Sequence, residues 1–231
     1  SNFLNLESES AILIETTTGK VLYEKNSNSQ LRPASVTKIM SILLIMDAIK
    51  NNEISLDTKV SCSAEASSMG GSQIWLNETE TLTVHEMLKA ICVVSANDCC
   101  VAMAEYIAGS EELFVEQMNK RAKELGMNDT CFKNCHGIDA DGHVTSAYDI
   151  YLIMQKLFNF EEFLGIIESG SIKVDVLRGE SLKTFTFEST NQFFWGTYQL
   201  PEGIIMLGGK TGTTNKAGCC LTLYVKDQNN N

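Results

Sequence analysis

Residues 33–50 read PASVTKIMSILLIMDAIK, and the rest of the chain is best interpreted from this stretch. From Lys38 to Ile49 nearly every side chain is apolar, which is typical of a helix buried on all sides. Pro33 marks the start of this helix. A spacing of three residues places Ser35 and Lys38 one turn apart on the same face, so the amine can reach the hydroxyl. Backbone N–H groups at the helix start also favour a developing oxyanion.

Lys38 can accept the proton of Ser35 only when its amine is neutral, and an ordinary lysine is charged at neutral pH. Burial and a second nearby cation would both lower its pKa, and Lys210 is a candidate for that cation. Taken alone, the S-x-x-K spacing also fits a helix cap followed by a solvated lysine. The interpretation therefore depends on the other motifs.

A second motif lies near the end of the chain, between apolar segments at 203–209 and 219–225 that indicate two strands joined by a hairpin. A glycine in an edge strand lets a peptide approach, while lysine and threonine can donate to a substrate carboxylate. We expect the backbone N–H of Thr213 to be a second oxyanion donor beside that of Ser35. The alternative is a turn with an exposed lysine. The motif consists of Lys210, Thr211 and Gly212.

A third motif, Ser95-Ala96-Asn97, falls between two apolar stretches and is predicted to lie at a helix junction. There the Ser95 hydroxyl can relay a proton between Lys38 and a leaving amine, and Asn97 can hydrogen-bond a substrate amide. A simple N-cap is the alternative for this motif in isolation. The order and wide spacing of the three motifs favour one serine active site over chance.

The chain closely resembles the low-molecular-mass penicillin-binding proteins that are D-alanyl-D-alanine carboxypeptidases, in the form found in sporulating Gram-positive bacteria. The resemblance covers nearly the whole chain. It is carried by ASVTKIM at 34–40, VSAND at 94–98, KELGM at 123–127, HGID at 136–139, TSAYD at 145–149 and GKTG at 209–212.

The resemblance implies a serine DD-carboxypeptidase that removes the terminal D-alanine from peptidoglycan stem pentapeptides through an acyl-enzyme, and that β-lactam antibiotics acylate at the same serine. By this resemblance Ser35 is the nucleophile and Lys38 its base. Ser95 and Asn97 form the second element. The carboxylate and oxyanion side consists of Lys210, Thr211, Gly212 and Thr213. The implied location is extracytoplasmic, in the cell wall or at the outer face of the cytoplasmic membrane.

Other functions remain open at this point. A DD-endopeptidase or a β-lactamase would use the same chemistry, and Thr213-Thr214 is shared with β-lactamases and high-molecular-mass transpeptidases. A class A β-lactamase would need a glutamate to activate water, but no E-x-x-L-N element lies between Ser95 and Lys210. A non-hydrolysing penicillin sensor or wall-binding module belongs to a different class. The intact Ser95 and Asn97 favour turnover instead.

Strands near both ends of the chain and a helical middle predict an α/β (α+β) fold with an inserted helical subdomain. The resemblance implies that this is the fold of serine β-lactamases and penicillin-binding transpeptidases, in which the sheet is antiparallel. We expect strands at Ala11–Glu15 and Lys20–Glu24, a mostly helical middle from about 84 to 163, a β-rich segment at 171–187 and the final hairpin. The chain then forms one catalytic domain, 1–231. Its sheet region covers about 1–60 and 165–231, and its helical region covers about 61–164.

The end of the chain departs from the family pattern. There a further strand and a closing helix follow the K-T-G hairpin, whereas residues 227–231 of this chain resemble the turn itself. We therefore expect that the C-terminal strand and helix are missing, and that the sheet has an open edge between the K-T-G hairpin and the strand at 11–15.

Composition limits the partners. A net charge of −11 excludes nucleic acid and electrostatic attachment to anionic lipid. No apolar run reaches transmembrane length, so membrane contact is expected only through segments absent from this chain. Cys131, Cys135 and His136 lack a second ligand pair, and neither a metal nor a cofactor is expected. The eight cysteines are expected to be mostly small apolar residues in a reducing setting.

Overall fold

The computed structural model describes residues 4–228, which contain the predicted terminal strands and helical middle and also two short strands, β3 and β4, that the sequence did not predict. The helices are α1 (Lys38–Lys50), α2 (Ala64–Ser67), α3 (Val84–Lys89), α4 (Asn97–Ala108), α5 (Glu111–Glu124), α6 (Ala147–Leu157) and α7 (Glu161–Ile167), with the short turns η1 (Ala34–Thr37), η2 (Ala90–Val94) and η3 (Gln192–Trp195). The strands are β1 (Ala11–Glu15), β2 (Lys20–Lys25), β3 (Lys59–Ser61), β4 (Thr81–Thr83), β5 (Ser171–Arg178), β6 (Ser181–Glu188), β7 (Ile204–Thr214) and β8 (Gly218–Asp227).

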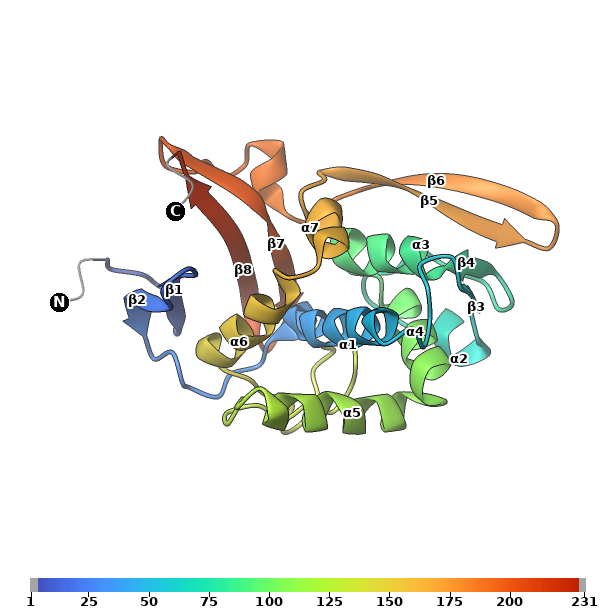
Figure 1. Ribbon diagram of the computed structural model, residues 1–231, viewed down its shortest axis with the longest axis horizontal. Coiled ribbons are helices and arrows are strands. Elements are labelled where there is room, and N and C mark those ends of the chain that lie inside the picture. The colour runs from blue at the N-terminus through green and yellow to red at the C-terminus, as the bar shows by residue number, and fades with distance from the viewer. Residues whose placement is uncertain (1–3, 229–231) are drawn as a thin grey trace.

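Helix α1 runs through the middle of the molecule, and α4, α5 and α6 pack around it (Figure 1). Its side chains Ile39, Leu43 and Ile45 are fully buried, as the uniformly apolar sequence predicted. Helix α5 differs because only every fourth residue of it is buried. It buries Phe114, Met118 and Ala122 while its other face meets solvent.

The β5–β6 hairpin forms where the sequence predicted strand structure, but it belongs to a different sheet from the terminal strands. The order in that sheet is β3-β4-β5-β6, and Thr81 of β4 pairs with Leu177 of β5. Side chains alternate between buried and more exposed along β5. Ile172, Val174 and Val176 are buried on the face that packs against α3 and η2. In Figure 1 the hairpin extends beyond α3.

The terminal strands form two separate antiparallel hairpins, β1–β2 and β7–β8. The first predicted strand, Ala11–Glu15, is confirmed with its bounds, and the second extends to Lys25. Within residues 4–228 no backbone pairing joins the two hairpins, which agrees with the open edge expected between them. The missing C-terminal strand and helix stay a prediction, as does the division into sheet and helical regions. Strand β8 ends at Asp227, and residues 229–231 of the predicted turn lie outside the described residues.

Two contacts of the β7–β8 hairpin position the site. Helix α7 packs against β7, and η1 packs against both strands of the hairpin. The start of α1 therefore lies beside the K-T-G strand (Figure 1). Among residues 4–228, no helix combines the length and the apolarity needed to cross a membrane.

Candidate active site

Ser35 and Lys38 lie at the entry to α1. Ser35 is in the 3-10 turn η1, and Lys38 is the first residue of the helix. The Lys38 Nζ atom donates to Ser35 Oγ at 2.9 Å and to the His136 carbonyl oxygen at 2.7 Å. The predicted reach between amine and hydroxyl is thus confirmed. The alternative of a solvated lysine is wrong, because the Lys38 side chain is fully buried.

Burial changes the protonation of both lysines. Desolvation lowers the pKa of Lys38 to about 8, although Cys100, Cys135 and Asp98 act in the opposite direction. At pH 7 about one molecule in ten then carries a neutral Lys38 amine. Desolvation, followed by the charge of Lys38, places the pKa of Lys210 well below its ordinary value. The charge of Lys38 thus acts on Lys210, whereas desolvation is the cause that lowers the pKa of Lys38, and the expected lowering by Lys210 stays a prediction.

Ser95 joins the second motif to the third. It ends the π-helical turn η2 and adopts a left-handed backbone conformation with φ +64° before α4 begins, so it lies at the predicted helix junction. This conformation is unfavourable for a residue other than glycine, and such residues cluster at functional sites. Lys210 Nζ donates to Ser95 Oγ at 2.9 Å, and both side chains are buried. The exposed-lysine alternative for the K-T-G motif is wrong.

Asn97 begins α4 and is held by a glycine-rich loop. Its backbone N–H donates to the Ser72 carbonyl, and its Nδ2 donates to the Gly70 carbonyl at 2.7 Å. Its Oδ1 is buried and is the only buried side-chain oxygen or nitrogen without a partner within residues 4–228. An acceptor of this kind is costly to leave unpaired, and a substrate N–H could satisfy it.

Strand β7 approaches the nucleophile through Gly212. A Cβ atom at this position would lie 2.6 Å from the backbone nitrogen of Ser35, so only glycine allows this approach. Thr213 is exposed, and the Thr211 hydroxyl contacts that of Thr190 at 2.6 Å. Lys210 Nζ also donates to the Thr211 carbonyl at 2.7 Å, so this amine already has two protein acceptors.

The sequence motifs did not predict several other contributors. The His136 carbonyl oxygen accepts from Lys38, and Asp139 Oδ1 accepts from the Thr214 hydroxyl at 2.9 Å. The only signal for these residues was the HGID segment at 136–139. Burial and the charge of Lys38 lower the pKa of His136 to about 3, so its imidazole is neutral at pH 7. Its contact with the site is through the backbone.

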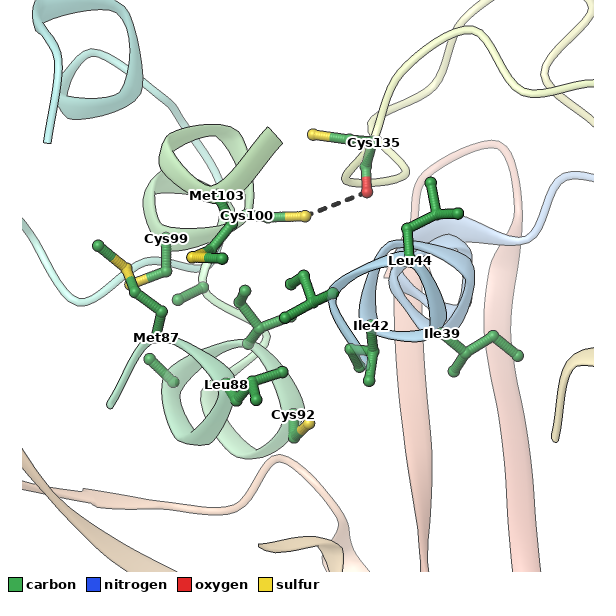
Figure 2. Close-up of a cluster of buried hydrophobic side chains, with 14 of the residues drawn as sticks. Ile39, Ile42, Leu44, Met87, Leu88, Cys92, Cys99, Cys100, Met103 and Cys135 are labelled. Atoms are coloured by element: carbon green, nitrogen blue, oxygen red, sulfur yellow. Dashed lines mark hydrogen bonds between the residues drawn. The ribbon is translucent and has the colours of Figure 1, made fainter. Parts of the chain in front are cut away.

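The cysteines are free thiols, and most pack in the core. Figure 2 shows Cys92, Cys99 and Cys100 among apolar side chains of α1, α3 and α4, with the Cys100 thiol donating to the Cys135 carbonyl at 3.2 Å. Burial raises the pKa of Cys92 to about 12, which keeps this thiol protonated. Within residues 4–228, no group of three or more histidine, cysteine, aspartate or glutamate residues is arranged to hold a metal ion.

Comparison with known proteins shows the family of this chain. Residues 1–231 match the family described as Peptidase S11, D-alanyl-D-alanine carboxypeptidase. The chain belongs to this family. It is 48% identical over 226 residues to the D-alanyl-D-alanine carboxypeptidase DacF of Bacillus subtilis, covering 96% of this chain and 55% of the relative. The corresponding values for DacA of Escherichia coli K12 are 34% over 219 residues, 92% and 51%. The chain thus spans about half the length of these curated relatives.

Two solved structures of penicillin-binding proteins share the fold. PBP3 of Streptococcus pneumoniae, a peptidoglycan synthesis regulatory factor, superposes with a TM-score of 0.80 at 31% identity, covering 94% of this chain and 62% of the other. Penicillin binding protein 5 of Haemophilus influenzae gives a TM-score of 0.85 at 26% identity, with 98% and 63% covered. The fold predicted from the motifs is therefore confirmed.

Proposed function

We propose that this chain carries the catalytic centre of a serine DD-carboxypeptidase, which removes the terminal D-alanine from peptidoglycan stem pentapeptides. One observation carries the proposal. The fully buried Lys38 amine, with its pKa lowered to about 8, lies 2.9 Å from Ser35 Oγ. This geometry supports a lysine that removes the serine proton without a histidine. Membership of the carboxypeptidase family supports the choice of substrate.

In the proposed acylation step, neutral Lys38 takes the proton of Ser35 while Ser35 Oγ attacks the carbonyl carbon of the penultimate D-alanine. The backbone N–H groups of Ser35 and Thr213 then stabilise the oxyanion. The peptide bond breaks, and the leaving D-alanine amine receives a proton through Ser95, whose hydroxyl is oriented by Lys210. Water hydrolyses the resulting ester and releases the shortened peptide.

Substrate binding follows from the remaining groups. The unpaired Asn97 Oδ1 accepts a substrate amide N–H, and Gly212 leaves room for the substrate backbone beside β7. The hydroxyls of Thr211 and Thr213 donate to the terminal carboxylate. Lys210 supports this side through its bond to the Thr211 carbonyl. β-Lactams would acylate the same serine, and the peptidoglycan substrate places the site of action outside the cytoplasmic membrane.

The test is D-alanine release from a D-Ala-D-Ala tripeptide, measured for the wild-type chain, Ser35→Ala and the control Ser68→Ala. Ser68 is exposed, so its removal leaves the site unchanged. We expect release by the wild type and by Ser68→Ala but none by Ser35→Ala, because no other group can form the acyl-enzyme. Release that survives Ser35→Ala would contradict the proposal.

The alternatives give different products in the same assay series. A DD-endopeptidase would cleave cross-linked dimers faster than the tripeptide, and a β-lactamase would turn over benzylpenicillin rapidly. A penicillin sensor would become acylated and release no D-alanine. Each of these outcomes would replace the carboxypeptidase assignment.

A further inference from the structure

Lys38 has a second partner besides the nucleophile, and that partner is a backbone carbonyl. One Nζ hydrogen bond goes to the His136 oxygen at 2.7 Å, and the other contact is with Ser35 Oγ at 2.9 Å. When Lys38 is neutral, an N–H directed at His136 turns the amine lone pair toward the Ser35 hydroxyl. The position of the His136 carbonyl therefore sets the direction in which Lys38 can accept a proton.

The segment 134–138 that carries this carbonyl is fixed at successive peptide groups. The Cys135 carbonyl accepts from Ser41 Oγ at 2.6 Å and from Cys100 Sγ at 3.2 Å. The N–H of Gly137, in the same peptide group as the His136 oxygen, donates to Asn134 Oδ1 at 2.7 Å. A Cβ atom on Gly137 would lie 1.9 Å from the Ala34 carbonyl oxygen, so this segment packs directly on the residue before the nucleophile.

Glu111, at the start of α5, provides an acidic anchor for this segment. Its Oε1 accepts the N–H of Cys135 at 2.9 Å and lies 3.4 Å from Nε2 of His136. The His136 Nδ1 atom accepts the N–H of Ile138, so the imidazole proton is on Nε2, facing the carboxylate. One carboxylate oxygen thus contacts both the backbone and the ring of the residues that present the carbonyl to Lys38.

We propose that Glu111 is a positioning residue for the reaction, which holds the Cys135–His136 segment so that the His136 carbonyl orients the Lys38 amine toward Ser35. Glu111 touches neither the substrate nor the reacting atoms and acts through the segment 134–138. The inference rests on the proposed function, because it assumes that Lys38 is the base. No sequence motif marks Glu111, since the group that it accepts from is the backbone N–H of Cys135, and nearly every residue carries such a group.

The test compares Glu111→Ala and Glu111→Gln with the control Glu112→Gln. Glu112 has the same charge in the same helical turn, but its side chain is exposed. The measurements are kcat and KM for the D-Ala-D-Ala tripeptide and the rate of acylation by benzylpenicillin between pH 6 and 10, each normalised to the protein fraction that becomes acylated. This normalisation removes any contribution from misfolded protein.

We expect Glu111→Ala to lower kcat and the acylation rate about tenfold with KM changed less than about twofold, because the amine is less well oriented before reaction. The rise of the acylation rate with pH should also shift to lower pH. A displaced His136 carbonyl stabilises the Lys38 ammonium less, which lowers the pKa of Lys38. Asp98, Cys100 and Cys135 also act on the pKa of Lys38, and Glu111 itself acts on the two thiols, so the comparison with Glu111→Gln separates the lost charge from the displaced carbonyl. Glu111→Gln should recover most of the rate, because its amide oxygen accepts the Cys135 N–H, and Glu112→Gln should match the wild type.

Asn134→Ala displaces the same His136 carbonyl by another change, because it removes the acceptor of the Gly137 N–H. It should also lower kcat and shift the pH dependence of the rate to lower pH. An unchanged acid limb and rate in both Glu111→Ala and Asn134→Ala would overturn the inference, as would a rise in KM with unchanged kcat. If the wild type and Glu112→Gln neither release D-alanine nor form a penicillin adduct, the proposed function itself has failed.

Discussion

At the residue scale, burial of Lys38 both costs free energy of desolvation and makes this residue able to act as a base. A fully buried amine is desolvated, and nearby acidic groups recover only part of the loss, so its pKa remains near 8 instead of 10.5. The same desolvation makes a lysine useful as a base near neutral pH. Removal of water thus destabilises the charged ammonium form of Lys38 and raises the fraction of the neutral amine, which is the form that accepts a proton.

This protonation gives a prediction about rate. Because only the neutral amine accepts the serine proton, kcat/KM should rise with pH and level off above an apparent pKa of about 8. At pH 6 the neutral fraction is about one in a hundred, so the rate should be about two orders of magnitude below the plateau. The measurement is kcat/KM for the tripeptide from pH 6 to 10. A profile that is flat over this range, or whose limb lies near pH 10, would contradict the role of Lys38.

At the element scale, the site depends on β7 lying directly against η1. The contact is permitted by Gly212, where a Cβ atom would meet the Ser35 nitrogen at 2.6 Å. Gly212→Ala must therefore separate the strand from the nucleophile. We expect acylation by benzylpenicillin to fall about a hundredfold and the free energy of unfolding to fall by about 1–3 kcal/mol.

Gly165→Ala is the matched control for this change. Gly165 lies in α7 without a positive φ angle, and a Cβ atom added there would meet no other atom within 4 Å. An alanine at this position should raise the free energy of unfolding by about 0.5–1 kcal/mol and leave acylation unchanged. Acylation rates and urea melts of both variants test the argument. If Gly212→Ala is acylated at the wild-type rate, then β7 can move away from η1 without loss of activity, and the argument is wrong.

The sequence predicted the contacts of the site only between residues that are near each other in the chain. Ser35 and Lys38 are three residues apart at the start of an apolar helix, so their contact could be predicted. The bond from Lys210 to Ser95 joins residues 115 positions apart, and the sequence indicated only that both belong to one site. The His136 carbonyl could not be identified, because every residue carries a carbonyl. The pairing of β5 with β4 was also hidden, since periodicity shows which face of a strand is buried but not its partner.

At the scale of the whole molecule, the charge of the chain opposes its proposed substrate. The net charge is −11, and a stem peptide ends in a carboxylate, so long-range electrostatics slow the encounter while the local donors of β7 bind the substrate. Salt should therefore accelerate the reaction. We expect kcat/KM for an acetylated, anionic tripeptide to rise about two- to threefold between about 10 and 200 mM NaCl.

A tripeptide with a free lysine amine and no net charge is the control, and its rate should change little with salt. Both rates are measured at one pH above the acid limb. A fall in the rate of the anionic peptide with salt would mean that a positive field at the site outweighs the charge of the molecule.

The central claim is that Ser35 is the residue that becomes acylated, and peptide mass mapping after incubation with benzylpenicillin tests it most directly. The protein is digested, and the peptide that carries the added mass of the penicilloyl group is sequenced in the mass spectrometer. We predict one adduct, on Ser35 within residues 33–38, and none in Ser35→Ala. An adduct on another residue, or one that persists in Ser35→Ala, would contradict the account.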